Sequence, residues 1–393
     1  MKADAIAAPR AAATPGTVPG VHAHRVIFID LTRALAVVLM VYGHTISALL
    51  APAYRVGPWY DAWVFQRGLT SSLFLLLSGF AFSIATTRHW HSHMRVSPAV
   101  FKRLRRFALF VVLGYALHFP AGNLAEIARI GPEQWRAFLA VDVLQLIGAM
   151  FIMIQALVML TRSRRVFMVT SFVLAVLTVI YTPVVWRRAW TDVLPLALAS
   201  YLSPAQGSQF PLFPFSASVL VGAAAGQLYA RWGASHLAAF ANVVLLGAGT
   251  LLAAAGLYVR AHGIELFGAG EASGIPGEFM LRTGVSLVIL GVIAHLSWRI
   301  TRLPHVFGAV AQESLLVYFV HLCIVYGSVW NAGLVQHFGE TLRPLQTLPL
   351  VIAIVGLMVL LAWGWNRVKH TKPHVARWVM AGAMTAGVIL VLV

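Results

Sequence analysis

Three ionisable side chains lie within one strongly apolar segment near the start of the chain. The stretch FIDLTRALAVVLMVYGHT contains Asp30, Arg33 and His44. A charged group at mid-bilayer costs on the order of 3 kcal/mol on insertion scales, so such groups tend to be retained for a function. Arg33 and His44 are eleven residues apart. A helix would place both on one face, roughly 16 Å apart along its axis. That face would offer a cation at one depth and a proton acceptor at another.

The amino-acid composition indicates an integral membrane protein. The chain has 393 residues, of which 60% are hydrophobic and 10% charged, with a mean hydropathy of +0.81. A soluble protein would carry about 25% charged residues. The formal charge of +17 does not indicate nucleic-acid binding, because the basic residues lie between the apolar segments. The single cysteine, Cys323, excludes an intramolecular disulfide.

Apolar runs long enough to cross a bilayer predict an all-α, polytopic integral membrane protein with about eleven transmembrane helices. Residues 1–25, rich in Ala, Pro and Gly, are expected to form a disordered cytoplasmic tail, and residues 26–393 a single multi-span domain. The expected spans are 26–50, 69–87, 107–120, 138–160, 166–186, 210–229, 236–258, 279–298, 313–333, 346–366 and 375–393.

The distribution of basic residues predicts the orientation of these spans. One side, with the first residues of the last span, holds 19 Lys and Arg, and the other side with its flanks holds nine. Because cytoplasmic loops carry the excess of positive charge, we expect the N-terminus inside and the C-terminus outside. His44 then lies near the outer surface and Arg33 near the inner one. The expected location is the cell (inner or plasma) membrane.

Four segments resemble known membrane acyltransferases. Arg33–ALAVVLMVYG–His44 resembles the first span of the transmembrane acyltransferase superfamily, which includes acyltransferase family 3. VDVLQLIGAMFI at 141–152 and FPLFPFSASVLVGAAAGQLYARW at 210–232 are similar to its heparan-α-glucosaminide N-acetyltransferase-like branch. ESLLVYFVHLCIVYG at 313–327 is similar to the late Ser/Tyr/His helix seen across the superfamily.

The resemblance implies an acyl-CoA-dependent O- or N-acyltransferase. Cytoplasmic acyl-CoA, with acetyl as the expected group, would donate to a sugar or glycan hydroxyl or amine on the other membrane face. In the acetylglucosaminide branch the catalytic histidine lies in the loop after the first span. Residues 51–68 contain no histidine, so His44 would carry that role here. Whether it acts as a base or as a covalent acyl carrier stays open.

Each residue on the first span also has a simpler interpretation. His44 could accept the proton of the attacking hydroxyl or amine, or it could be an interfacial histidine bonded to water. Arg33 could bind phosphate oxygens of CoA with Asp30 orienting it, or it could pair with Asp30 and extend to the lipid headgroups.

Two later spans supply further candidates. Asp142 and Gln145 could orient the acceptor or support His44, although an interhelical polar contact explains them as well. His321 could assist proton transfer or bind the acyl thioester, or it could be a hydrogen-bonded interior histidine. His118 is a further candidate.

A basic cluster follows the second apolar segment. It comprises Lys102, Arg103, Arg105 and Arg106. The cluster could attract polyanionic CoA, with Arg103 and Arg106 as donor-binding candidates, or it could bind anionic membrane lipids. Three histidines alternate just before it, in RHWHSHMRV, but no cysteine or carboxylate completes a metal site. We therefore expect no metal ion.

Two other classes of protein remain open from the sequence. A transporter of a sugar-like or amphiphilic solute would also use intramembrane charges and a span broken by Pro211 and Pro214. The sequence does not divide into two halves of matching hydropathy, which such transporters often show. A structural partner in a larger membrane complex is the third class. The sequence does not indicate whether copies of the chain form a homo-oligomer.

Overall fold

The computed structural model describes residues 26–262, 274–300 and 302–392, and the expected tail, 1–25, lies outside them. The first half contains α1 (Ile27–Leu49), α2 (Pro58–Arg88), α3 (Trp90–His93), α4 (Pro98–Leu117), α5 (Leu124–Ile127), α6 (Pro132–Leu139), α7 (Val143–Thr161), α8 (Arg164–Arg187) and α9 (Leu196–Leu202). The second half contains α10 (Leu212–Leu228), α11 (Leu237–Phe240), α12 (Ala248–Ala261), α13 (Ile275–Ser297), α14 (His305–Gln312), α15 (Ser314–Val325), α16 (Leu334–Phe338), α17 (Pro344–Thr371) and α18 (Pro373–Leu392).

The helical content confirms the predicted all-α membrane protein. In the described ranges, eight helical segments are long and apolar enough to cross a membrane, and a bent pair, α14 with α15, would make a ninth. The expected third span is part of α4, which begins earlier than predicted, at Pro98. Four basic residues in its first half keep α4 below that level of apolarity. The expected count of eleven is therefore not established.

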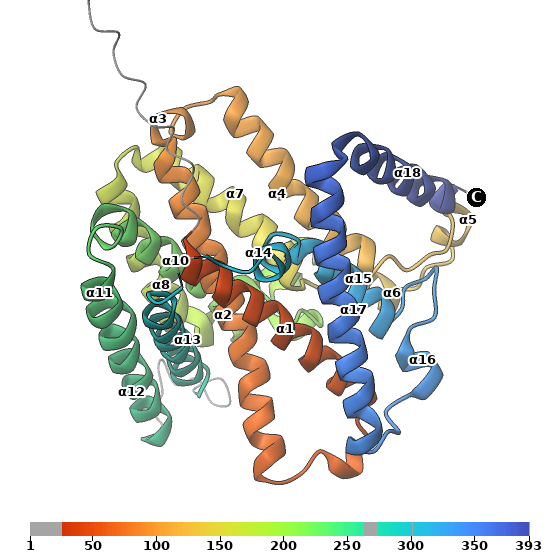
Figure 1. Ribbon diagram of the computed structural model, residues 1–393. Coiled ribbons are helices and arrows are strands. Elements are labelled where there is room, and N and C mark those ends of the chain that lie inside the picture. Colours follow the sequence, from red (N-terminus) through yellow and green to blue (C-terminus); the bar gives the residue numbers. More distant parts are fainter. Residues whose placement is uncertain (1–25, 263–273, 301, 393) are drawn as a thin grey trace, which may run out of the picture.

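The last helix takes a course different from the predicted eleventh span. α17 ends at Thr371, and α18 then turns away and runs across that end of the molecule instead of back along α17 (Figure 1). Pro373 starts α18, so Lys372 alone separates the two helices. The predicted outward position of the C-terminus therefore has no support from the path of the chain.

α2 and α10 form the most closely packed pair of helices at the centre. Gly79 on α2 and Gly222 on α10 lie so near the opposite backbone that a side chain would collide with the carbonyls of Val219 and Leu76. Small residues allow such close backbone approach in membrane helices, where packing rather than hydrophobic exclusion drives association. This pair forms a rigid base beside α1.

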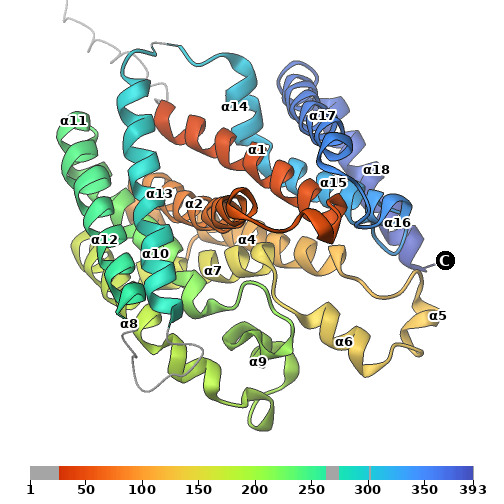
Figure 2. The ribbon, with the colours of Figure 1, turned by 90° about the horizontal axis from the view of Figure 1, so that it is seen from below.

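α1 crosses the molecule obliquely. Figure 2 shows it lengthwise, whereas α2 is seen nearly along its axis. α11, α12 and α13 lie on one side of α1, and α15, α16 and α17 lie on the other (Figure 1). Thr32 and Thr45 donate their hydroxyl hydrogens to carbonyls four residues earlier, so neither buried side chain is left without a partner. Because other helices lie on both of its sides, α1 is packed within the molecule along its middle.

A buried ion pair holds the bend between α14 and α15. The two helices meet at 73°, and Glu313 at the bend is only 5% exposed. Its carboxylate accepts hydrogen bonds from Lys369 Nζ at 2.9 and 3.0 Å and from Asn366 Nδ2 at 2.9 Å. Because a buried carboxylate needs such partners, α17 fixes the point from which α15 starts.

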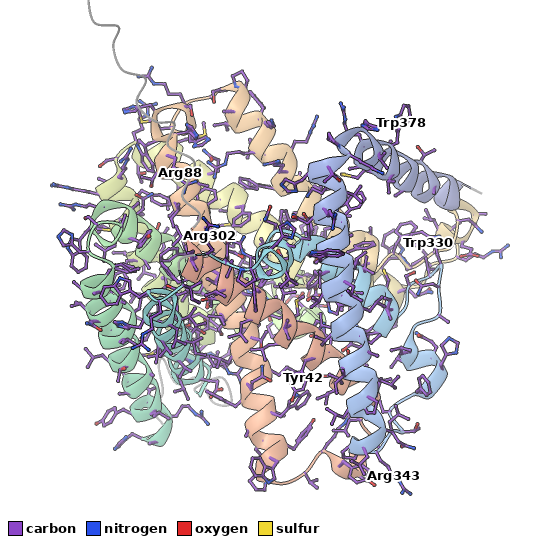
Figure 3. The ribbon with its side chains drawn as sticks, in the orientation of Figure 1. Tyr42, Arg88, Arg302, Trp330, Arg343 and Trp378 are labelled. Carbon is purple, nitrogen blue, oxygen red and sulfur yellow. The ribbon has the colours of Figure 1, made fainter. Side chains whose placement is uncertain are left out.

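We expect the end of the molecule that carries Arg88 to face the cytoplasm, because basic residues concentrate there. Arg343 lies at the opposite end (Figure 3). With Cys323 replaced by alanine, Arg95→Cys should escape a membrane-impermeant maleimide added to intact cells, and Thr341→Cys should be labelled. Labelling at 95 and protection at 341 would reverse the orientation.

Candidate functional site

A cavity of about 820 Å³ surrounds the second half of α1. Its walls come from α1, α2, the end of α4, the α6–α7 junction, the segment that leads into α10, α13 and α15. The cavity has the size of a typical small-molecule site. It contains His44 and Asp142, two of the three residues predicted to be catalytic.

The third predicted residue, His321, contacts His44 directly. His44 Nδ1 and His321 Nε2 lie 2.8 Å apart, and the two rings stack at 5.1 Å with an angle of 14°. His321 is fully buried. Its other nitrogen, Nδ1, lies 2.8 Å from the carbonyl oxygen of Val317, one turn earlier on α15.

These contacts fix the proton positions of the neutral pair. A carbonyl only accepts, so His321 Nδ1 must carry a hydrogen, and its Nε2 is then an acceptor. His44 Nδ1 must therefore donate to it. His44 Nε2 is left as an unprotonated nitrogen on a side chain that lines the cavity. One backbone carbonyl thus makes His44 Nε2 the basic nitrogen of the site.

Asp142 joins this pair through a tyrosine. Asp142 precedes α7, and its Oδ1 accepts from the amide of Val143 at 2.7 Å. Its Oδ2 accepts from the hydroxyl of Tyr318 at 3.2 Å, and the Tyr318 ring lies 5.6 Å from that of His321. The carboxylate therefore holds α7 and α15 together beside the two histidines.

The backbone just before Asp142 is fixed by the strongly bent segment ahead of α10. The carbonyl of Val141 accepts from the amides of Gln209 and Phe210 at 3.1 and 3.0 Å. The amide of Val141 donates to Ser208 Oγ at 2.9 Å. The residues just before Pro211 therefore position this part of the cavity wall.

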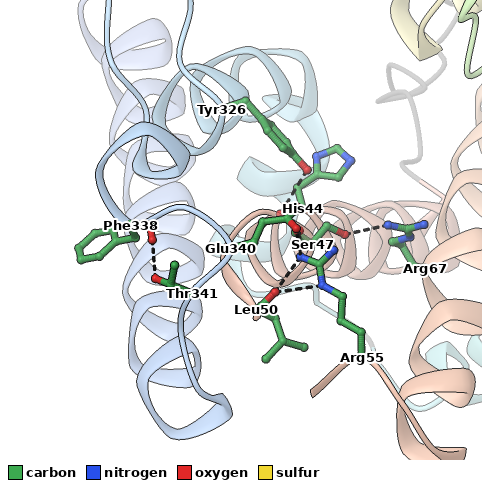
Figure 4. A network of polar contacts seen from close by, with 9 residues as sticks. All are labelled: His44, Ser47, Leu50, Arg55, Arg67, Tyr326, Phe338, Glu340 and Thr341. Carbon is green, nitrogen blue, oxygen red and sulfur yellow. Dashed lines mark hydrogen bonds and ion pairs between the residues drawn. The ribbon is translucent and has the colours of Figure 1, made fainter. Parts of the chain in front are cut away.

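The loop after α1 and the segment before α17 hold the end of α1. Arg55 donates to the carbonyl of Leu50 and pairs with Glu340 at 3.0 Å, as Figure 4 shows. Leu342 and Leu49 are also joined through their backbones at 3.0 Å. Carbonyls at a helix end need such donors, so these contacts stabilise the last turn of α1, which follows His44.

Several cavity residues could not be singled out from the sequence. Tyr326 lies with its ring 5.9 Å from that of His44, and its hydroxyl donates to the His44 carbonyl at 3.4 Å (Figure 4). Arg67 and Arg282 also line the cavity. In the sequence these two arginines add only to the count of basic residues, because the residues around them do not indicate which helices will be neighbours.

The predicted donor-binding residues lie outside the cavity wall. α1 contributes only residues between Leu39 and Ser47, so Asp30 and Arg33 are not among the lining residues. Arg103 donates to Thr86 Oγ1 at 2.9 Å and lies over the Phe82 ring, while Arg106 is exposed. The structure therefore assembles the three catalytic candidates but does not bring the four donor-binding candidates to them.

The remaining candidates divide between the cavity and the helix interior. His118 lines the cavity, with Nδ1 donating to the carbonyl of Gly114 at 3.2 Å. Gln145 is fully buried at the α4–α7 contact, beside Gly114, and does not line the cavity. Among the described residues, His, Cys, Asp and Glu form no group of three placed to hold a metal ion.

A family model matches the region that contains most of the site. The model for the heparan-alpha-glucosaminide N-acetyltransferase catalytic region matches residues 25–262, well over half of the chain. The match includes His44, Arg67 and Asp142 and ends before α13, so Tyr318 and His321 lie beyond it. No curated protein matches the chain.

The hydrogen positions of the histidine pair can be tested chemically. Diethyl pyrocarbonate acylates unprotonated imidazole nitrogen, so we expect it to modify His44 at Nε2. His321 should react several-fold more slowly, because both its nitrogens are hydrogen-bonded and its side chain is buried. Peptide mass spectrometry measures both rates. His118 reports whether the reagent enters the cavity, and modification of His118 without His44 would contradict the proton assignment.

Proposed function

The chain belongs to the heparan-alpha-glucosaminide N-acetyltransferase catalytic family, and from that premise we propose that it transfers acetyl from acetyl-CoA to a sugar hydroxyl or amine. Family membership supports a membrane acetyltransferase. The identity of the donor, the identity of the acceptor and the location of the acceptor at the outer membrane face are part of the proposal. Membership also favours an enzyme over the transporter considered from the sequence. The observation that carries the proposal is the hydrogen-bonded pair of His44 and His321 at the cavity.

The pair supports general-base catalysis. His44 Nε2 removes the proton of the acceptor hydroxyl or amine as that group attacks the thioester carbonyl. The resulting imidazolium keeps its Nδ1 hydrogen bond to His321, which spreads the developing positive charge. When the tetrahedral intermediate collapses, the carbon–sulfur bond breaks and the thiol of CoA takes the proton from His44. The products are the acetylated acceptor and CoA, and the base is restored.

The cavity supports a sugar as acceptor. Its volume, about 820 Å³, is large enough for a saccharide unit together with the acyl end of the donor. Ser47, Thr70, Ser71 and Gln209 line it with groups that both donate and accept hydrogen bonds. Such groups suit hydroxyl-rich ligands.

We place the nucleotide of the donor toward the other end of α1. Arg33 precedes the first cavity residue of α1, Leu39, by six positions, which is roughly 9 Å along a helix. A guanidinium there suits phosphate oxygens, and the extended pantetheine arm would carry the thioester toward His44. Arg103 and Arg106 would raise the local concentration of the polyanion without contacting the thioester.

His44→Gln should lower the rate of acetyl transfer by about 10²–10⁴-fold, because glutamine keeps a hydrogen-bonding group but cannot carry a proton. The measurement uses purified protein, radiolabelled acetyl-CoA and a panel of sugars. Acetyl-CoA binding should persist. The parent rate should rise with pH as the imidazole loses its proton and then level off.

His321→Leu serves as the matched comparison for His44→Gln. Leucine removes the acceptor for His44 Nδ1 but leaves Nε2 able to take a proton, so the rate should fall less than in His44→Gln. A folded His44→Gln protein with the activity of the parent would remove His44 from the mechanism.

Arg33→Ala should weaken acetyl-CoA binding more than Arg33→Lys, because lysine keeps the charge but loses the planar fork. Calorimetry with acetyl-CoA measures both. Arg231→Ala, an exposed basic residue on the same predicted side, is the control for general loss of charge. Equal affinity of Arg33→Ala and the parent would assign Arg33 to lipid headgroups instead.

A further inference from the structure

Two guanidinium groups line the cavity that contains His44, and the proposed reaction uses neither. Arg67 comes from α2 and Arg282 from α13. Asp142 is the one carboxylate among the described residues that line the cavity, and it already accepts from Tyr318 and from the amide of Val143. The wall therefore carries more positive than negative charge.

Arg282 forms an ion pair through one nitrogen of its guanidinium. Its Nε lies 2.7 Å from Glu278 Oε1, and Glu278 Oε2 lies 2.6 Å from Arg260 Nη1. A single carboxylate thus serves two guanidinium groups, so the charge of this trio stays positive. The Nη atoms of Arg282 are directed away from Glu278 and toward α2.

Gly68 makes room for that guanidinium. A Cβ at residue 68 would collide with Nη1 and Cζ of Arg282 and lie 2.8 Å from Nη2. Any side chain at this position would displace Arg282. The absence of a side chain lets Arg282 extend over α2 and reach the cavity next to the residue that precedes Gly68, which is Arg67.

Arg67 is fixed by a neutral partner. Its Nη1 donates to Ser47 Oγ at 2.8 Å, its Cγ lies beside Gly43, and its guanidinium lies 5.4 Å from the Trp63 ring centre. Figure 4 shows its guanidinium next to Ser47. Within the described residues, no carboxylate lies within ion-pair distance of Arg67.

Two guanidinium forks with unused N–H groups suit an oxyanion, because carboxylate, sulfate and phosphate oxygens match the spacing of the fork. Building on the proposed function, we infer that Arg67 and Arg282 form an oxyanion subsite that orients an acceptor carrying a carboxylate, sulfate or phosphate group. The anion would bind on the wall beside His44. A hydroxyl or amine elsewhere on the same molecule would then lie against Nε2.

The predicted orientation assigns the anion to the acceptor rather than to the donor. Arg282 lies two turns from the start of α13, and Arg67 lies within the first three turns of α2. Both starts are at the predicted outer end, whereas CoA enters from the other side. The phosphates of CoA are the other oxyanions that Arg67 and Arg282 could bind, and the experiment below distinguishes them from an anionic acceptor.

Calorimetry without acetyl-CoA measures the subsite directly. The probes are glucose, glucuronate, glucose 6-sulfate and glucose 6-phosphate. At least one of the three anions should bind the parent protein about tenfold or more tightly than glucose, as expected for a charge-assisted contact. Arg67→Gln and Arg282→Gln should each remove most of that preference, and Arg282→Lys should retain part of it.

Arg260→Gln is the matched control, because it changes the contacts of Glu278 without changing a residue of the cavity wall. It should keep the preference for the anion. If no anion binds better than glucose, or if Arg67→Gln and Arg282→Gln keep the preference, the inference is wrong.

A second arm compares acetyl-CoA with acetyl-pantetheine, which lacks the nucleotide phosphates. If Arg67→Gln weakens binding of acetyl-CoA but not of acetyl-pantetheine, the anion belongs to the donor and the acceptor assignment is overturned. The subsite and the proposed function can fail independently of each other. His44→Gln should lose most acetyl transfer but keep the preference for the anionic sugar over glucose. If the parent protein prefers the anionic sugar but transfers no acetyl group, the proposed acetyltransferase function is rejected and the oxyanion subsite stands.

Discussion

The hydrogen bond between His44 Nδ1 and His321 Nε2 is the contact on which the site depends, because it joins residues 277 positions apart in the chain. It forms only if α1 crosses the molecule obliquely and α15 presents His321 to it. Its direction is set by the carbonyl of Val317, which forces the proton pattern through both rings. Inside a protein such a chain of polar groups is costly unless every member has a partner. The histidines, Tyr318 and Asp142 therefore form one connected polar group in the folded protein.

The position of α15 is in turn set by a second buried polar group at its start. Glu313 occupies the 73° bend, where its carboxylate is held by Lys369 and Asn366 of α17. A buried carboxylate without these partners would be strongly destabilising, so the bend cannot easily straighten. Two turns later, α15 carries His321 at the depth of His44. A residue that does not line the cavity thus fixes the direction of a helix that forms the cavity wall.

The sequence was sufficient for features that are local. An apolar run with ionisable groups at helical spacing identifies α1, and the same reasoning predicted an all-α membrane protein and the trio of His44, Asp142 and His321. The meeting of these three residues, however, depends on tertiary packing. Arg282 beside Gly68 could not be predicted, because it requires knowing that α13 and α2 are neighbours. The course of α18 relative to α17 could not be predicted either, since apolarity gives a length but no direction.

The two ends of α1 lie in different surroundings, and this difference constrains any reaction that uses both. His44 is in the cavity, whereas the wall ends at Leu39 and does not reach Arg33. A donor bound at Arg33 must therefore pass between α1 and its neighbours before its thioester meets His44. The cavity wall at this end of α1 includes the apolar side chains of Leu39, Met40 and Phe74. For a donor bound as we propose, these apolar groups would suit the uncharged pantetheine arm and disfavour the charged nucleotide, so the phosphates would stay at one end of α1 and the acyl group would reach the other.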